Sequence, residues 1–150
     1  MKLAEALQER SDLLRRIEQL RTRLDNNVLV QEGETPAENP AALLEELDRC
    51  IALSDELMKR INLTNAAVMV EGETLTALLA HRDCLKMKLS VWHDAVNAAS
   101  QTARRATRSE IRIHSAIDVP ALQKRVDEAS KLLRETDNRI QAANWLNDLI

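Results

Sequence analysis

Glycine and proline, the residues that interrupt helices, occur at only five of the 150 positions of this chain. They are confined to Gly33, Gly72, Pro36, Pro40 and Pro120. Phe and Tyr are absent, and Leu, Ile, Val, Ala and Met carry nearly all of the apolar volume. Such a composition has high helix propensity and low strand propensity. Long helices are therefore expected between these positions, and connections are expected around them.

The apolar residues recur in steps of three and four, which is the spacing of amphipathic helices. Four helices are predicted, over residues 2–26, 40–66, 74–106 and 118–148. Asn39, Thr74 and Asp118 are expected N-caps, and Pro40 and Pro120 fit the first turns of their helices. Because helices of these lengths can lie side by side, the predicted fold is all-α, an up-down four-helix bundle in a single domain spanning 1–150.

Two of the connections share a local pattern. Residues 28–35 and 68–74 both contain Val-x-Val followed by Glu-Gly-Glu-Thr, and residues 111–117 alternate apolar and polar side chains as a short strand would. In an up-down bundle the first and third connections fall at the same end. Residues 28–32 and 110–114 are therefore predicted to pair as a small ribbon.

Charge is also distributed unevenly between these connections. Positions 32–48 hold six acidic residues and no Lys or Arg, whereas positions 104–112 hold four Arg and one acid. These charged end segments are expected to neutralise each other, within one chain or between neighbouring chains; the alternative is two solvated charge runs that contribute little energy. Their candidate residues are Glu32, Glu34, Arg104, Arg105, Arg108 and Arg112.

The helix predicted over 74–106 has apolar residues behind its inward stripe as well as on it. The positions behind the stripe are Ala77, Ala80, Cys84, Met87, Val91 and Ala98. A helix that is apolar nearly all round needs cover on both sides, which one four-helix bundle does not give. The expected result is a homo-oligomer that packs this helix against a neighbour. A helix sunk centrally in a distorted bundle, and tolerated surface alanines, are the alternatives.

Several polar residues fall on inward-facing positions, and Arg82 is one of them, with a guanidinium that is costly to bury without a partner. It should therefore have carboxylate or carbonyl partners. One interpretation is a structural ion pair that fixes helix register. The other is a small anion-binding pocket lined by Arg82, Asp83, Asn65 and Glu110.

The sequence gives little support to other kinds of chemistry. Glu-x-x-His pairs, His pairs four residues apart and phosphate-binding glycine loops are all absent, so neither a metal nor a cofactor is expected. The net charge of -3, and a basic segment without interleaved aromatics, argue against a nucleic-acid partner. No run of 18 apolar residues and no signal-like start are present, so a membrane location is not expected and the predicted compartment is the cytoplasm.

A set of short motifs resembles the septicolysin-like family of small bacterial all-helical proteins. The motifs are Val30-Gln31-Glu32-Gly33-Glu34, Ile61-Asn62 with Thr64-Asn65, Arg82-Asp83-x-Leu85, Ser109-Glu110-Ile111, Asp118-Val119 with Leu122-Gln123, and Ile140-Gln141 with Asn144-Trp145. The resemblance spans nearly the whole chain. It implies a bacterial, cytoplasmic protein and supplies no established reaction.

These features together predict a non-enzymatic helical assembly protein whose partner is a second copy of itself. Self-association is expected through the helix over 74–106 and through the charged, strand-like connections. One alternative is a membrane-active, cytolysin-like protein, as the name of the resembling family suggests. The other is a ligand-binding or enzymatic bundle with a polar pocket around Arg82.

Overall fold

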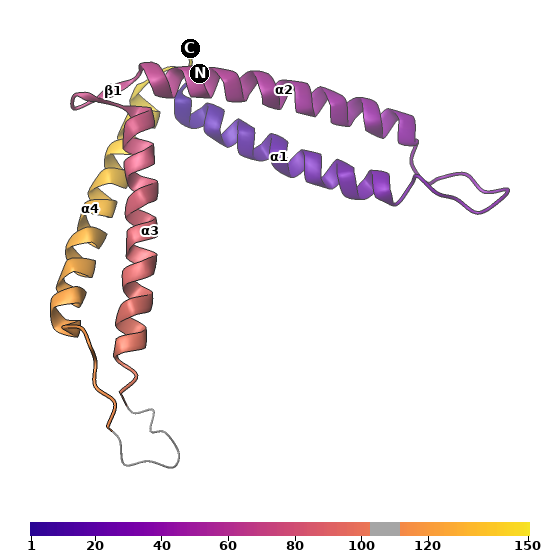
Figure 1. Ribbon diagram of the computed structural model, residues 1–150. Helices are drawn as coiled ribbons and strands as arrows, with labels where there is room; N and C mark the ends of the chain where they lie inside the picture. The colour runs from indigo at the N-terminus through magenta and orange to yellow at the C-terminus, as the bar shows by residue number, and fades with distance from the viewer. Residues whose placement is uncertain (103–111) are drawn as a thin grey trace. The chain divides into compact units, whose positions relative to one another are not determined.

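The computed structural model describes residues 1–102 and 112–150, which form four helices and one two-stranded sheet (Figure 1). The helices are α1 (Leu3–Asp25), α2 (Pro40–Ala67), α3 (Leu75–Ala99) and α4 (Val119–Leu146). The strands are β1 (Met69–Val70) and β2 (Glu73–Thr74). The predicted all-α class with four helices is confirmed.

The three predicted N-caps are present, and each fixes the start of a helix. The side chain of Asn39 accepts a hydrogen bond of 3.0 Å from the backbone N–H of Ala41. Thr74 and Asp118 accept equivalent bonds from the first turns of α3 and α4, at 3.1 and 3.0 Å. These bonds satisfy N–H groups that have no partner inside the helix, which explains why the helices begin where they do.

α3 is shorter than the predicted helix over 74–106, because it ends at Ala99. The backbone N–H and the hydroxyl of Ser100 both donate to the carbonyl oxygen of Val96, at 3.0 and 2.7 Å. The next N–H group, that of Gln101, donates to the carbonyl oxygen of Ala98 at 3.3 Å, a bond over three residues of the kind that tightens the last turn of a helix. Residues 103–106 of the predicted helix lie outside the described residues.

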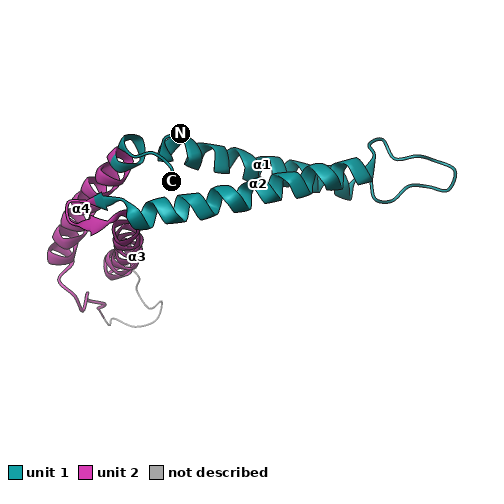
Figure 2. Cartoon of the chain, turned by 90° about the horizontal axis from the view of Figure 1, so that it is seen from above, with its two compact units in different colours: residues 1–69, 143–150 teal, residues 70–142 magenta. Residues whose placement is uncertain are grey.

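The chain divides into two compact units, coloured separately in Figure 2. Unit 1 comprises residues 1–69 and 143–150, and unit 2 comprises residues 70–142. Each unit is built on one pair of helices, α1 with α2 and α3 with most of α4. The single continuous domain expected from the sequence stays a prediction.

In unit 1, α1 and α2 run side by side (Figures 1 and 2), with Leu20, Leu43 and Leu57 among the buried side chains. The C-terminal segment is joined to the start of α1. Leu3 N–H donates to the carbonyl of Asn147 at 3.0 Å, and Leu149 N–H donates to that of Met1 at 2.9 Å. Both ends of the described chain are thus tied into unit 1.

In unit 2, α3 packs against α4 through an apolar cluster. Leu89 of α3 and Val126 and Ala129 of α4 are buried at its centre, and Trp92 packs against them. The guanidinium of Arg125 lies over the Trp92 ring, 4.5 Å from the ring centre, and makes a cation–π contact with it. This side of α3 is therefore covered by α4.

The sheet is a hairpin of two short strands joined by the two residues Glu71 and Gly72, and the conformation of this turn explains why the strands pair. Glu71 and Gly72 have φ angles of 50° and 94°, and positive φ at both central positions defines the turn that matches strand twist. Arg139 of α4 lies 2.9 Å from the carboxylate of Glu71 and donates to Glu73 at 3.4 Å. The hairpin is thus held to α4.

The described residues 28–32 contain no strand, and the ribbon predicted between residues 28–32 and 110–114 stays a prediction. The chain turns there with a bond of 3.0 Å from Glu34 N–H to the carbonyl of Gln31. Only the third residue of that turn, Gly33, has positive φ, at 85°. A turn of this type splays the two segments that it joins, so residues 28–35 do not form a hairpin like that of residues 69–74. Residues 110 and 111 lie outside the described residues.

Candidate functional site

α3 has two apolar sides that face in different directions. Leu75, Leu78, Leu85 and Leu89 are buried. Because each residue turns a helix by 100°, the six positions predicted as an interface lie on the side away from these leucines. All six are exposed, and we call them the α3 back face: Ala77, Ala80, Cys84, Met87, Val91 and Ala98.

The two largest side chains of the α3 back face are the most informative. Met87 is 70% exposed and Val91 is 61% exposed. The Cys84 thiol beside them is free and exposed. Exposed single apolar residues are ordinary, but a continuous stripe of them along several turns of one helix is typical of an interaction surface.

The spacing of the α3 back face is regular. Ala77, Ala80, Cys84, Met87 and Val91 follow one another in alternating steps of three and four. This is the seam spacing of coiled coils, in which each side chain fits between those of a facing helix. The stripe therefore has the pattern of a helix-pairing surface, and α4 covers the opposite side of α3.

The predicted polar pocket is only partly represented in the structure. The Nε and Nη2 atoms of Arg82 both donate to one carboxylate oxygen of Asp83, at 3.0 and 2.8 Å. Asn65 belongs to unit 1, whereas Arg82 and Asp83 belong to unit 2. Glu110 lies outside the described residues. The structure therefore brings two of the four residues together, as an ion pair on α3, and the four-residue pocket stays a prediction.

The charged end segments are also only partly described. Glu32, Glu34 and Arg112 are exposed, and Arg104, Arg105 and Arg108 lie outside the described residues. Pairing between the two segments therefore stays a prediction.

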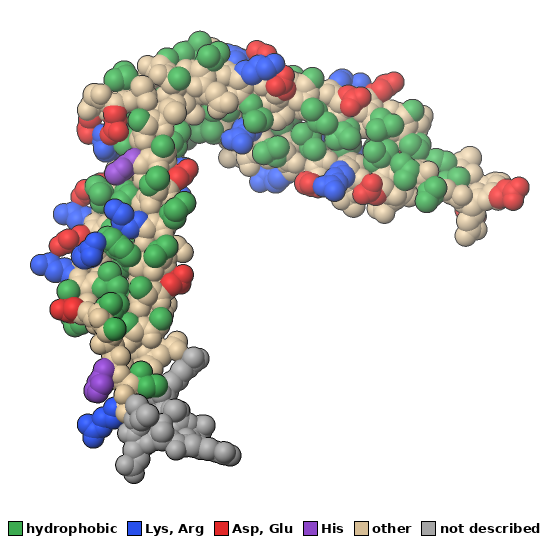
Figure 3. Space-filling view, in the orientation of Figure 1, with side chains coloured by type: hydrophobic (Ala, Val, Ile, Leu, Met, Phe, Trp, Pro, Cys, Tyr) green, Lys and Arg blue, Asp and Glu red, His purple; other side chains and the backbone are tan. Residues whose placement is uncertain are grey.

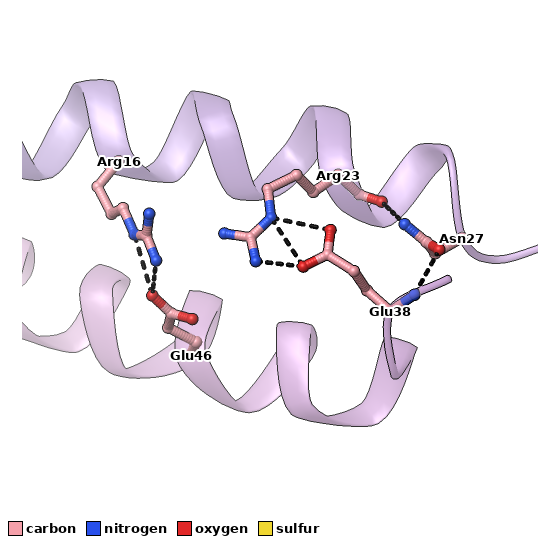
Figure 4. Close-up of polar contacts among 5 residues, drawn as sticks. All are labelled: Arg16, Arg23, Asn27, Glu38 and Glu46. Carbon is pink, nitrogen blue, oxygen red and sulfur yellow. Dashed lines mark hydrogen bonds and ion pairs between the residues drawn. The ribbon is translucent and has the colours of Figure 1, made fainter. Parts of the chain in front are cut away.

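Two other acids of the same run have partners on α1 that the sequence did not indicate (Figure 4). Arg16 donates through Nε to Glu46 at 3.0 Å, and Arg23 donates through Nε to both carboxylate oxygens of Glu38, at 3.2 and 3.0 Å. Asn27 completes the group, because its side chain donates to the Arg23 carbonyl at 2.8 Å and accepts from Glu38 N–H at 2.9 Å. These bonds fasten α1 to the start of α2.

These ion pairs lower the pKa of both carboxyl groups. The hydrogen bond from Arg23 is the largest cause for Glu38, and the hydrogen bond from Arg16 is the largest cause for Glu46; partial desolvation opposes both. A carboxyl group whose pKa is lower in the folded state than its ordinary value of 4.5 stabilises the fold above that value. The contribution is lost as the pH falls through the lowered folded-state pKa.

Acid sensitivity of unit 1 should therefore depend on these two carboxylates. The free energy of unfolding is expected to fall as the pH drops below 4.5, and to fall less in a Glu38→Gln/Glu46→Gln variant. Urea unfolding of both proteins at several pH values between 3 and 7 measures the difference. A matched Glu32→Gln/Glu34→Gln variant, which changes exposed acids of the same run, should keep the wild-type pH dependence. Identical pH profiles for all three proteins would contradict the assignment.

Unit 1 carries a second exposed apolar stripe that the sequence reasoning missed. Leu44, Ile51 and Met58 of α2 are each more than 40% exposed, and their spacing of seven places them on one side of the helix. Figure 3 shows hydrophobic side chains gathered along the α1–α2 pair on the face in view. The seven-residue repeat of these apolar residues is the sequence signal that indicates the stripe.

A shallow cavity lies at the start of α1 in unit 1. Its wall combines the exposed ring of Trp145 with acidic side chains of α1. Two of these acids are already engaged, since Glu5 accepts from Lys2 N–H at 2.7 Å and Asp12 pairs with Arg15. Their bonds give them structural roles within the helix.

Residues 1–102 and 112–150 contain no group of three or more His, Cys, Asp or Glu side chains placed to hold a metal ion. Over the same described residues, every helix is too short or too polar to cross a bilayer. The feature that stands out is the α3 back face. Fold and surface together define a small all-helical protein whose candidate functional site is a helix-pairing surface.

The chain belongs to a family of unknown function, DUF6847, which matches residues 10–149. It is also similar to a solved structure titled as a crystal structure of a functionally unknown conserved protein from Corynebacterium diphtheriae. The two are 37% identical with a TM-score of 0.94, over 100% of this chain and 99% of that one. No curated protein matches the chain. Neither finding names the septicolysin-like family, so that resemblance stays a prediction.

Proposed function

We propose that this protein is a non-enzymatic helical assembly protein that forms a homo-oligomer through the α3 back face. The observation that carries the proposal is the exposure of Met87 and Val91 on a helix whose opposite side is already packed against α4. Full burial of such side chains stabilises a complex by about 1.5 to 3 kcal/mol each. A stripe with this spacing is best covered by another helix.

The charged end segments form the second part of the proposal. Glu32 and Glu34 are exposed in the first connection, and Arg112 is exposed in the third. Opposite charges on neighbouring chains would attract, but solvated pairs are weak and are screened by salt. We therefore assign them a role in orientation and the α3 back face the main role in stability.

We also propose that the protein is cytoplasmic. Cys50 and Cys84 are both free thiols, which suits a reducing compartment. The two alternative functions have weaker support. A cytolysin-like role rests on the septicolysin-like resemblance alone, and a pocket around Arg82 would have to use an arginine whose Nε and Nη2 already bond to Asp83.

The thiol of Cys84 gives a direct test, because it lies on the α3 back face and is exposed in the single chain. In a Cys50→Ser variant, the rate of maleimide labelling of Cys84 should fall at least about tenfold as protein concentration rises from well below the dissociation constant to about 50 times above it. A Cys84→Ser variant, which retains half-buried Cys50, should label at a rate independent of concentration. A constant, fast rate for Cys84 up to millimolar protein would contradict the proposal.

A further inference from the structure

The side chains of the α3 back face change in size along the helix. Ala77, Ala80 and Cys84 occupy its first turns, whereas Met87 and Val91 follow them. All five are exposed and share the alternating spacing of three and four. Over residues 77–91 the surface therefore has small residues at one end and large residues at the other, and Ala98 lies beyond this stretch. Such a stretch fits a copy of itself best when the two run in opposite directions.

We propose that two copies of this chain pair through α3 in an antiparallel arrangement about a two-fold axis. This inference rests on the proposed function and specifies its geometry. The seam positions meet in three kinds of layer: Cys84 faces the partner's Met87, Ala80 faces the partner's Val91, and Ala77 faces the partner's Asp94. By symmetry each layer occurs twice.

Packing favours this direction over the parallel one. In each antiparallel layer a small side chain receives a larger one, so the helices approach evenly along their length. Parallel pairing would place Met87 against the partner's Met87 and Ala80 against the partner's Ala80. The first contact would hold the helices apart and leave the second as a void, which close-packed interfaces avoid.

Charge favours the same direction. Asp94 continues the seam three residues after Val91 and is exposed. In a parallel pair it would face the partner's Asp94, a like-charge contact. In the antiparallel pair it lies at the first turn of the partner's α3, which begins at residue 75. The positive end of the partner's helix dipole stabilises a carboxylate there.

Single-cysteine variants distinguish the two directions. Ala80→Cys and Val91→Cys are made separately, each in a Cys50→Ser/Cys84→Ser background, and are oxidised alone and as a mixture. In the antiparallel pair, two copies of the same introduced cysteine lie eleven residues apart along the axis, or about 16 Å. This is far beyond the separation that a disulfide spans. Each variant alone should therefore stay unlinked, and the mixture should give a covalent heterodimer.

The results of the cross-linking and the mass measurement test two different statements, the direction in which the two α3 helices run and self-association itself. A disulfide that joins two copies of one variant overturns the antiparallel arrangement and leaves self-association standing. Light scattering before oxidation reports the mass: a single-chain mass for both variants at high micromolar concentration overturns the proposed function itself. A dimer mass with no link in any sample overturns this pairing of layers.

A charge variant gives an independent test in the protein with its seam otherwise intact. Asp94→Lys should weaken association about five- to tenfold in the antiparallel pair, because it places a cation at the positive end of the partner's helix. In a parallel pair Asp94 would face the partner's Asp94, and the same change would replace this pair of carboxylates by a pair of Lys side chains. Association would then not be weakened, because one like-charge pair replaces another. Unchanged or tighter association of Asp94→Lys therefore overturns the inference.

Discussion

Replacing Met87 and Val91 with glutamate should raise the dissociation constant for self-association at least about 100-fold. Each dimer would bury four new carboxylates where it now buries four apolar side chains, each of which contributes about 1.5 to 3 kcal/mol when covered. A tenfold change in the dissociation constant corresponds to about 1.4 kcal/mol. Losing even half of the burial energy of the four side chains would therefore raise the dissociation constant about 100-fold or more. Sedimentation velocity over a concentration series measures the shift.

The matched control for this variant is Leu132→Glu on α4. Leu132 is 43% exposed and belongs to the same unit, but it lies outside the α3 back face. It should keep the wild-type dissociation constant. Because Met87 and Val91 are exposed in the single chain, the double variant should also keep the helical content and unfolding midpoint of the monomer. Equal association of the double variant and the wild-type protein would exclude the α3 back face as the interface.

Asn27→Ala should lower the free energy of unfolding of unit 1 by about 1 to 3 kcal/mol, the cost of leaving buried polar groups without partners. Asn27 is 7% exposed and joins the end of α1 to the residue before the α2 cap through two hydrogen bonds. Its loss leaves the Arg23 carbonyl and the Glu38 N–H without these partners and removes two of the bonds that position Glu38 beside Arg23.

Chemical denaturation followed by circular dichroism measures this effect. The neighbouring Asn26→Ala variant is the matched control, because Asn26 is exposed and contributes its backbone to the helix end. It should change stability by less than about 0.5 kcal/mol. Equal stability losses for the two variants would show that the bonds of Asn27 do not hold the connection.

Local sequence signals predicted the helices well. The caps at Asn39, Thr74 and Asp118 depend on side chains that bond within three residues, so their positions can be read without knowing the fold. The extended end of the third helix was predicted from its apolar spacing. Its actual end at Ala99 is marked by a backbone bond from Gln101 N–H to the Ala98 carbonyl, which apolar spacing does not register.

The connections show where sequence patterns lose their value. Glu32-Gly33 and Glu71-Gly72 have the same sequence, yet positive φ at both residues occurs only in the second pair. The ion pairs of Glu71 and Glu73 with Arg139, 66 or more positions away, accompany that difference. A contact at this separation follows from how the hairpin meets α4, and the local motif contains no information about it.

The candidate site was predicted in outline because helix periodicity separates the two sides of α3. Exposure of all six back-face residues agrees with the sequence pattern, whereas the partner that covers them is still a proposal. The pairs between α1 and α2 could not be predicted, since Arg16 meets Glu46 only in one register of the two helices. The exposed stripe of Leu44, Ile51 and Met58 was not predicted, although its seven-residue repeat is present in the sequence.

Light scattering of the unmodified protein at micromolar to high micromolar concentration tests self-association most directly. If the α3 back face pairs with a second copy, the mass should rise with concentration and level off at twice that of one chain. A mass of one chain throughout this range would contradict the proposal, because Met87 and Val91 would then remain exposed in solution.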